Sequence, residues 1–380
     1  MSEPLAVRTA RTAQIDPDAA ARELARDLRH DAPALVLLFA SSHLDVDALV
    51  QQLDQRLPGH DVLGCTTSGE ISPVGFHERS AVALSLCGVR WHAERIAPLS
   101  RFTHGMGSRA VSSACAGLGV AADRPGESIV GLVFIDGLQA AEEMLMASLG
   151  IAAPSLPIVG ASASDDFAFE HTHVFHGGSA HEDSAVFLML KVPGPMHLLK
   201  QQHFRRTDRK VVVTGALPHQ RRVTELDGKP AAQVYARLLG EPLGALSRRG
   251  RFLLPFSVMI QGEPFIRSVM RVEPGEGLHF ACAVEEGVVL TLMRPGDLIA
   301  STREGIAAAR RAVGGTMAAM LAFNCLGRLF EARDSGRTDE LAAAFHGCPV
   351  AGLHTYGEQY AALHVNHTLT GLVLGPGGAR

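Results

Sequence analysis

The sequence lacks the features that mark several common classes of protein. Its six cysteines form no Cys-x-x-Cys pair, which argues against a zinc knuckle and against a disulfide framework. Charge or proline interrupts every apolar run well before the ~20 residues that a membrane-spanning helix needs. Basic and acidic residues nearly balance, at 35 against 39, so no global field favours nucleic acid or a membrane surface. We see no signal peptide and expect a cytoplasmic protein.

Aromatic residues are scarce as well, at 5% of the chain, whereas 47% of the residues are hydrophobic. A chain of 380 residues with this composition is long enough for two or more domains with hydrophobic cores. The cysteines lie mostly in apolar runs, where we expect reduced thiols packed in the core. The 18 histidines are an unusual number, which makes histidine the first residue type to consider for a ligand.

One pattern occurs three times along the chain. An apolar run ends near a phenylalanine, and 25 to 29 residues later a second apolar run meets a glycine that small or polar residues follow. The three pairs of phenylalanine and glycine are Phe39 and Gly64, Phe134 and Gly160, and Phe323 and Gly352. Each interval fits one helix with two short connections. Each glycine loop ends on a carboxylate, at Glu70, Asp166 and Glu358.

These repeats predict an α/β fold of strand-helix-strand units in mixed sheets, with the three phenylalanines at equivalent positions. A helix that joins two parallel strands places the residues after both strands at one rim of the sheet, where α/β proteins bind ligands. The three glycine loops are therefore our candidates for a binding site.

Residues 200–222 carry seven basic residues against one acid and predict a boundary between domains. A solvated edge explains this run more simply than a patch for phosphate or a partner. We predict a helical lead-in over residues 1–30, a first domain over 31–200 and a second over 220–380.

Four motifs carry a family resemblance. They are Gly-Cys-Thr-Thr-Ser-Gly-Glu at 64–70, Leu-Asp-Gly-Lys-Pro-Ala at 226–231, Phe-Asn-Cys-Leu-Gly-Arg at 323–328, and the third glycine loop at 349–358 with Asn-His-Thr at 366–368. With them the chain resembles the FIST sensory family in both its N-terminal and C-terminal halves. The leucine and glycine before Arg328 depart from the usual pattern, which leaves Arg328 in register but weakens any role for Leu326 or Gly327.

The resemblance implies a non-catalytic sensor of bacterial signal transduction that binds small molecules such as amino acids. The length of the chain is similar to that of a stand-alone branch of the family, the haem-binding nitric oxide sensors that act on partner histidine kinases. The leading expectation is therefore haem and nitric oxide, with a histidine kinase or a cyclic-dinucleotide enzyme as partner. A sensor of amino-acid-like ligands without haem is the alternative.

The candidate residues for a small ligand combine hydroxyls, carboxylates and one cation. Glu70 or Glu358 could meet an ammonium group, and Arg328 a carboxylate. We expect these residues to line one shared pocket or two related ones: Thr66, Thr67, Glu70, Arg328, Tyr356 and Glu358. Thr67→Val and Glu358→Gln should then weaken binding without changing the melting temperature, whereas equal loss of stability would favour a purely structural turn.

Haem requires an apolar slot and one axial ligand. Two groups of histidines could supply that ligand, one among the aromatic residues of 167–176 and one in or after the third loop: His171, His173, His176, His354, His364 and His367. A thiol hydrolase that uses Cys65 and His77 remains a further alternative, although no third orienting group accompanies them. An absorption spectrum separates haem from the other two possibilities.

Overall fold

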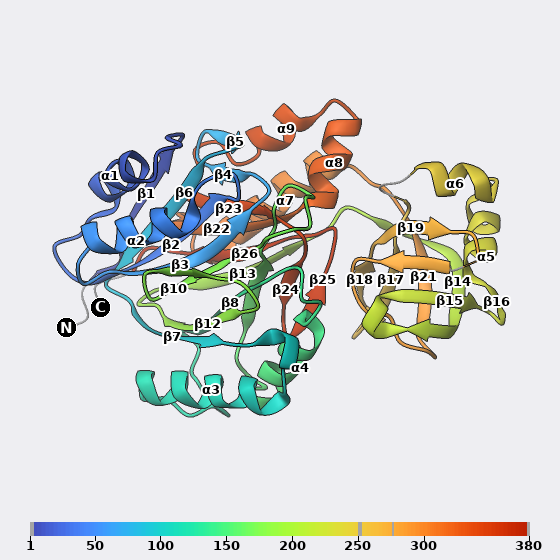
Figure 1. The fold of residues 1–380 in the computed structure, drawn as a ribbon, viewed down its shortest axis with the longest axis horizontal. Helices are drawn as coiled ribbons and strands as arrows, with labels where there is room; N and C mark the ends of the chain where they lie inside the picture. Colours follow the sequence, from blue (N-terminus) through green and yellow to red (C-terminus); the bar gives the residue numbers. More distant parts are fainter. Residues whose placement is uncertain (1–3, 250–252, 276, 378–380) are drawn as a thin grey trace.

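The computed structural model describes residues 4–249, 253–275 and 277–377. Three six-stranded sheets pack around one core, and a smaller β domain lies beside them (Figure 1). We call the three sheets with their helices the body, and the smaller domain the insert. The body consists of three successive units of the same design, so the predicted α/β repeat is confirmed.

Each unit of the body runs through a first strand, a helix, a parallel strand-helix-strand segment, a short hairpin and a last strand. The first unit comprises β1 (Ala6–Thr12), α1 (Pro17–Leu28), β2 (Ala34–Ser41), α2 (Val46–Arg56), β3 (Asp61–Thr67), β4 (Glu70–Ser72), β5 (Gly75–His77) and β6 (Ala81–Cys87). The second comprises β7 (Arg90–Ile96), α3 (His104–Leu118), β8 (Ile129–Ile135), α4 (Glu142–Ala152), β9 (Ile158–Ser162), β10 (Val174–His176), β11 (Ser179–His181) and β12 (Ala185–Lys191).

The third unit follows the same order but is interrupted after its first strand. It comprises β13 (Met196–Gln201), α7 (Leu298–Ala312), β22 (Ala319–Cys325), α8 (Leu326–Asp334), α9 (Thr338–Ala343), β23 (Val350–Thr355), β24 (Glu358–Tyr360), β25 (Leu363–Val365) and β26 (Leu369–Leu374). The insert occupies the gap between β13 and α7.

The three sheets have equivalent strand orders, and each borrows a hairpin from another unit. The orders are β1-β6-β2-β3-β10-β11, β7-β12-β8-β9-β24-β25 and β13-β26-β22-β23-β4-β5. In every sheet the two central strands are parallel, as their helical crossovers require. Because every hairpin completes a neighbouring sheet, the three units interlock in a cycle.

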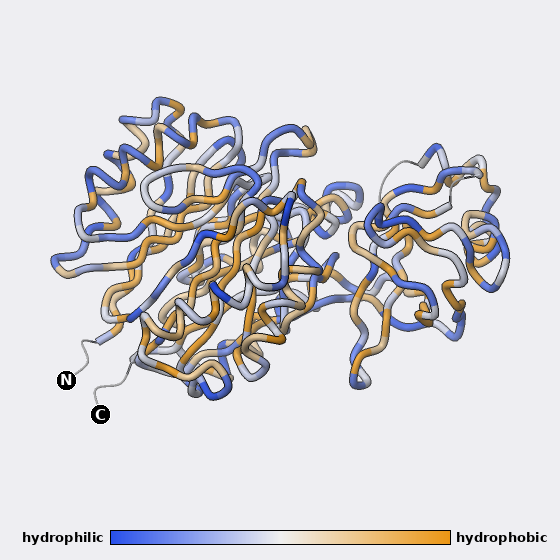
Figure 2. Tube along the Cα trace, turned by 60° about the horizontal axis from the view of Figure 1, so that its bottom comes forward, coloured by the Kyte–Doolittle hydropathy of each residue, from blue (hydrophilic) through white to orange (hydrophobic). Residues whose placement is uncertain are grey.

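Phe39, Phe134 and Phe323 meet in the middle of the body. Their ring centroids lie 5.7, 6.1 and 6.0 Å apart in edge-to-face contacts, and all three rings are fully buried. Alternate residues of all three sheets surround them in one hydrophobic cluster. Figure 2 shows these strands as the hydrophobic interior of the body. The prediction that the phenylalanines are equivalent is confirmed.

The three loop glycines lie where parallel strands approach most closely. A Cβ atom at Gly64, Gly160 or Gly352 would come within 1.8, 2.0 or 2.3 Å of a carbonyl oxygen on the adjacent strand. Only glycine permits this approach. Strand packing therefore explains the repeated glycine without any ligand.

The insert is a curved eight-stranded sheet with two helices. It comprises β14 (Arg205–Leu217), β15 (Arg222–Leu226), β16 (Lys229–Pro230), α5 (Ala231–Leu239), α6 (Leu243–Arg249), β17 (Phe256–Ile260), β18 (Glu263–Arg267), β19 (Val269–Glu273), β20 (Gly277–Phe280) and β21 (Val289–Arg294). The order is β18-β17-β21-β14-β15-β20-β19, with β16 paired to β15, and its own hydrophobic cluster holds it together. Figure 1 shows it standing beside the body.

The structure divides the chain at other places than the three predicted segments. Residues 1–30 contain β1 and α1, which belong to the first unit rather than to a lead-in. The predicted start at residue 220 falls inside the insert, and four of the seven basic residues, within 205–210, begin its longest strand. The two-domain prediction missed the insert because β13 pairs with β26, a strand about 170 residues away in sequence.

Candidate functional site

The three glycine loops converge at one end of the body and bond to one another. The Ser164 amide donates to the Thr66 carbonyl at 3.1 Å, and the Ser68 amide donates to the His354 carbonyl at 3.1 Å. The Thr355 hydroxyl donates to the Ser162 carbonyl at 2.5 Å. The predicted rim therefore exists, but its backbone and hydroxyl groups are largely used in holding the three units together.

Four of the six predicted binding residues are buried in such structural contacts. Thr66, Thr67, Glu70 and Glu358 are fully buried. Glu70 accepts hydrogen bonds from Thr67 and from Ser80, which lies just before the last strand of the unit. These contacts account for the residues without a ligand, and their binding role stays a prediction.

Glu358 forms the corresponding contact in the third unit. One of its carboxyl oxygens accepts hydrogen bonds from the amide of Thr368 at 3.1 Å and from its hydroxyl at 2.5 Å. The other oxygen, Oε1, is buried and has no partner among the described residues. Burial raises the pKa of Glu358 to about 8, so this side chain is largely protonated at neutral pH.

Glu358→Gln is expected to weaken the dependence of stability on pH. The folded wild type holds the Glu358 proton up to about pH 8, whereas an unfolded carboxyl loses it near 4.5, so stability falls as the pH rises between these values. Buried histidines such as His354, whose pKa burial lowers to about 3, oppose this trend below pH 6.5. Between pH 6.5 and 8 the wild type should therefore lose about 1.5 kcal/mol more than the variant, measured by urea unfolding.

Glu78→Gln is the matched control, because the Glu78 side chain is 71% exposed. Its pH dependence should equal that of the wild type. An unchanged pH dependence in Glu358→Gln would show that Glu358 is ionised in the folded chain.

Among the described residues Arg328 is the largest fully buried side chain, and it is not part of the wall of any of the three pockets described below. Its Nε donates to Asn324 Oδ1 at 2.8 Å, and one Nη donates to the Thr302 hydroxyl at 2.6 Å. Burial lowers its pKa to about 10. In this conformation Arg328 braces α7 against β22 and does not reach a ligand.

A cavity lies between the body and the insert. It has a volume of about 220 Å³ and a mainly apolar wall. The body contributes residues of the second and third units, and the insert contributes β19, β20 and the segments beside them. The lining residues are Gly137, Glu142, Phe167, Phe169, Arg221, Leu253, Ser268, Val269, Met270, Phe280, Ala281, Cys325, Leu326, Gly327, Tyr356, Asn366 and His367.

Three aromatic rings form one wall of this interdomain cavity. Phe169 stacks on Tyr356 with ring centroids 4.9 Å apart, and Phe167 lies 5.5 and 5.7 Å from these two rings. Asp166, Phe167 and Phe169 all have positive φ, a strained backbone that is more common at functional sites. The Tyr356 hydroxyl donates to Asp165, whose carboxylate also accepts the amides that follow Phe169. A fixed aromatic loop therefore faces the insert.

A charged cluster closes another side of the cavity. Arg221 of the insert pairs with Glu142 at 2.6 Å and with Glu143 at 3.0 Å, both at the start of α4 in the body. Burial opposes the charge on Arg221, but the two carboxylates raise its pKa above the ordinary value. Its Nε is buried and has no partner among the described residues.

Asn366 supplies an unsatisfied acceptor, the counterpart of the unsatisfied donor on Arg221. Its Nδ2 lies 3.4 Å from His364, while its Oδ1 is buried and without a partner in the described part of the chain. Two residues of the cavity wall thus each hold a buried, unsatisfied atom, a donor on Arg221 and an acceptor on Asn366. Buried polar groups usually have partners, so this pair points to a ligand or ordered water.

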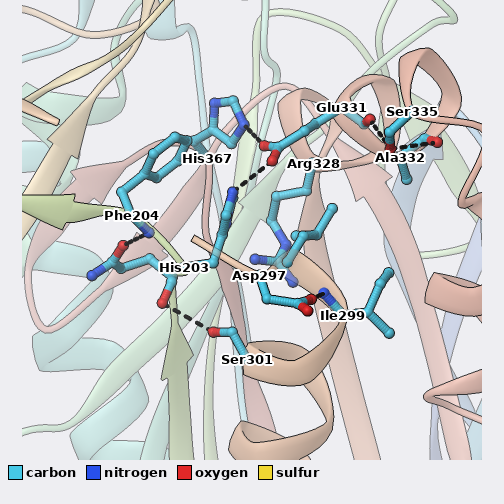
Figure 3. Close-up of polar contacts among 12 residues, drawn as sticks. His203, Phe204, Asp297, Ile299, Ser301, Arg328, Glu331, Ala332, Ser335 and His367 are labelled. Atoms are coloured by element: carbon cyan, nitrogen blue, oxygen red, sulfur yellow. Dashed lines mark hydrogen bonds and ion pairs between the residues drawn. The ribbon is translucent and has the colours of Figure 1, made fainter. Parts of the chain in front are cut away.

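His367 links the cavity to the two segments that connect body and insert. Its Nε2 lies 3.3 Å from one oxygen of Glu331, and His203 Nε2 lies 2.8 Å from the other (Figure 3). His203 belongs to the segment that enters the insert, and Gly296 of the returning segment packs against its carbonyl. Burial alone would raise the pKa of Glu331, but the two histidines hold it at about 2. The carboxylate therefore bridges the cavity wall and the connection.

The structure separates the other candidate histidines. His171 is exposed and pairs with Glu182, and His173 lies beside the same carboxylate. His176 is half-buried in the hairpin of β10, and His364 is buried next to Gln359. His354 lines a different pocket on the body. Within residues 4–249, 253–275 and 277–377, no three histidine, cysteine or acidic side chains are grouped as metal ligands would be.

Cys65 and His77 have separate roles in the fold. Cys65 is part of the central core, where burial raises the pKa of its thiol. His77 contacts Ser72 at 2.7 Å and Arg11 at 3.5 Å. Neither contact activates a thiol nucleophile.

Sequence reasoning named Tyr356 and His367 but missed most of the cavity wall. Phe167 and Phe169 stood out as an aromatic stretch, and Arg221 as part of the basic run, without a binding role. Asn366 was noted only as part of a family motif.

In the described part of the chain, every helix is too short or too polar to cross a membrane.

Comparison with known proteins assigns both halves of the chain. The FIST N domain matches residues 34–229, and the FIST C domain matches residues 231–361. An uncharacterized protein of Methanocaldococcus jannaschii is 27% identical over 287 residues, which are 70% of this chain and 55% of that protein; this chain therefore spans about half the length of that relative. A cyanuric acid hydrolase from A. caulinodans superposes with a TM-score of 0.41 at 8% identity, covering 98% of this chain and 99% of that one. The two domain matches together span most of the sequence, and the chain belongs to the FIST family.

Proposed function

We propose that this chain is a non-catalytic sensor and that it binds a small, mostly apolar molecule of the amino-acid type in the interdomain cavity. FIST proteins are associated with signal transduction. The observation that carries the proposal is that two residues lining an apolar cavity hold unsatisfied polar atoms, Arg221 Nε and Asn366 Oδ1. Few polar groups in a mainly apolar hollow are typical of small-molecule sites.

An amino acid matches these groups in chemistry and charge. Its carboxylate would accept from Arg221, and its ammonium group would donate to Asn366 or to Glu142. An apolar side chain would lie against Phe167, Phe169 and Tyr356. Arg221, Glu142 and Glu143 together carry one negative charge, which favours a ligand with a cationic group over an anion.

Haem does not fit this cavity as folded. A volume of about 220 Å³ is smaller than the ~300–1,000 Å³ of sites for drug-sized ligands, and haem is larger than most of those. Its propionates would also face Glu142 and Glu143. His171 and His173 border an open hollow with Asp45, Asp47 and Glu170, which suits propionates no better. We therefore place the amino-acid-type ligand first, and haem binding stays a prediction for absorption spectroscopy.

Binding of a ligand in the cavity would be signalled by the position of the insert relative to the body. A ligand that contacts both Arg221 and Asn366 joins the insert to the body and favours the closed arrangement. His367, Glu331 and His203 connect the cavity wall to the segment on which the insert moves. We propose that a partner histidine kinase or cyclic-dinucleotide enzyme reads this arrangement.

A thermal-shift screen of amino acids tests the binding proposal. A ligand that binds only the folded chain raises its stability, by about 2.7 kcal/mol at 100 times Kd. Phe169→Ala should weaken the best ligand about tenfold, because it removes the outer ring of the aromatic wall. Phe169 is 55% exposed, so the unliganded variant should melt close to the wild type.

Ile151→Ala is the control for loss of an exposed apolar side chain elsewhere, since Ile151 is 75% exposed on α4. It should bind like the wild type. Equal affinity of Phe169→Ala and the wild type would place the ligand outside the cavity. A Soret band after incubation with haemin, lost in His367→Ala, would instead support haem.

A further inference from the structure

A second hollow lies on the body, between the hairpin β4–β5 and the helices α8 and α9. Its volume is about 610 Å³, within the range of small-molecule sites. It forms because the hairpin of the first unit completes the sheet of the third. Arg11, Ser68, Gly69, Phe76, His77, Arg333, His346 and His354 are among its lining residues. We call it the hairpin groove.

His354 forms the floor of the hairpin groove and is only 1% exposed. Its Nδ1 lies 3.0 Å from Asn324 Nδ2. The orientation of this amide is fixed, because Asn324 Oδ1 accepts from Arg328 Nε. The amide therefore donates to Nδ1, and the proton of the neutral imidazole is on Nε2.

The Nε2 side of the ring faces the groove. A Cβ atom at Gly69, which lines the groove, would lie 3.1 Å from His354 Cδ2, the atom beside Nε2. Nε2 is buried and has no partner among the described residues. His354 thus holds a fixed, buried N–H group without an acceptor beside the groove, and glycine at position 69 keeps a side chain away from that edge of the ring.

The charges around this donor favour an anion. Arg11 has no carboxylate partner in the described part of the chain, and Arg333 pairs only with the exposed Glu78. Arg328 lies behind His354, joined to it through Asn324. Asp339 and Glu78 line the groove as well, and these two carboxylates are as exposed to solvent as Arg11 and Arg333. The exposed charges therefore balance, and the preference for an anion comes from the buried His354 N–H group with Arg328 behind it.

We propose that the hairpin groove is a second binding site, for a small molecule that carries a carboxylate or phosphate group. The oxyanion accepts from His354 Nε2 and pairs with Arg11 and Arg333. This site is separate from the interdomain cavity and does not depend on the ligand proposed there. The buried contacts from His354 through Asn324 and Arg328 reach Thr302 on α7, the first helix after the insert.

Titration calorimetry of the full chain with inorganic phosphate and with succinate, in a buffer free of both, tests the proposal. We expect saturable binding of at least one probe and a loss of affinity of about tenfold or more in Arg11→Gln. Arg11 is exposed, so this variant should fold normally. Arg8→Gln removes the same charge from an exposed position of the same strand outside the groove and should bind like the wild type.

His354→Phe keeps a ring of similar shape and should abolish binding if the variant folds. The relative affinity for phosphate and succinate identifies which oxyanion the site prefers. Lack of saturable binding for both probes would overturn the proposal. Equal affinities in Arg8→Gln and Arg11→Gln would also overturn it, because the binding would then lie elsewhere.

Discussion

Phe323→Ala is expected to lower the free energy of unfolding by about 3–5 kcal/mol, the range for a fully buried phenylalanine. The Phe323 ring lies where the three sheets meet, in contact with Phe39 and Phe134 at 6.1 and 6.0 Å. Its removal leaves a cavity that none of the interlocked sheets can fill by moving alone. Urea unfolding followed by circular dichroism measures the loss.

Because the three units are equivalent, we expect the same loss of stability at each of the three phenylalanines. Phe39→Ala and Phe134→Ala should cost the same as Phe323→Ala within about 1 kcal/mol, since all three rings are fully buried and each contacts the other two. Phe169→Ala makes the same chemical change at an exposed ring and should cost much less. A large difference among the three core variants would contradict a common core.

Arg221→Met is expected to weaken the ligand found in the screen by about 100-fold or more. The change removes the donor for the ligand and leaves Glu142 and Glu143 without their cation across the interface. Removing one partner of a buried ion pair costs about 3–5 kcal/mol. Part of this cost destabilises the closed arrangement of the insert and the body. Calorimetry measures the affinity, and small-angle X-ray scattering shows whether the insert moves away from the body.

Arg206→Met is the matched control on the insert. Arg206 is exposed on β14 and is not among the cavity residues, so its variant should keep the affinity and the dimensions of the wild type. If Arg221→Met bound the ligand as tightly as the wild type, Arg221 would not be part of the binding site.

The repeat could be predicted from sequence because each unit meets the same packing requirement with the same residue type at the same position. The glycines at 64, 160 and 352 are needed where strands touch, and the phenylalanines fill one shared core, so both stay visible as spacing. The insert could not be located in this way. Its place follows from the pairing of β13 with β26, which only the folded chain reveals.

The site was predicted only in part for a related reason. Small hydroxyl residues after a strand can bind a ligand, but they can equally well form hydrogen bonds within the fold. Thr67 forms such a structural bond, because its hydroxyl donates to Glu70. The interdomain cavity combines Phe169, Arg221 and Asn366, which lie far apart in sequence and have no common motif. Tyr356 and His367, which the sequence suggested for a small ligand and for haem, line this cavity because they belong to the third loop region, which also faces the insert.

The central claim is that a small molecule of the amino-acid type occupies the cavity between the body and the insert. The most direct measurement is the electron density of crystals grown with the amino acid that most stabilises the chain. We expect density between Arg221 Nε and Asn366 Oδ1, with the ligand side chain against Phe169 and Tyr356. An empty cavity, with the ligand bound at another place on the chain, would contradict the account.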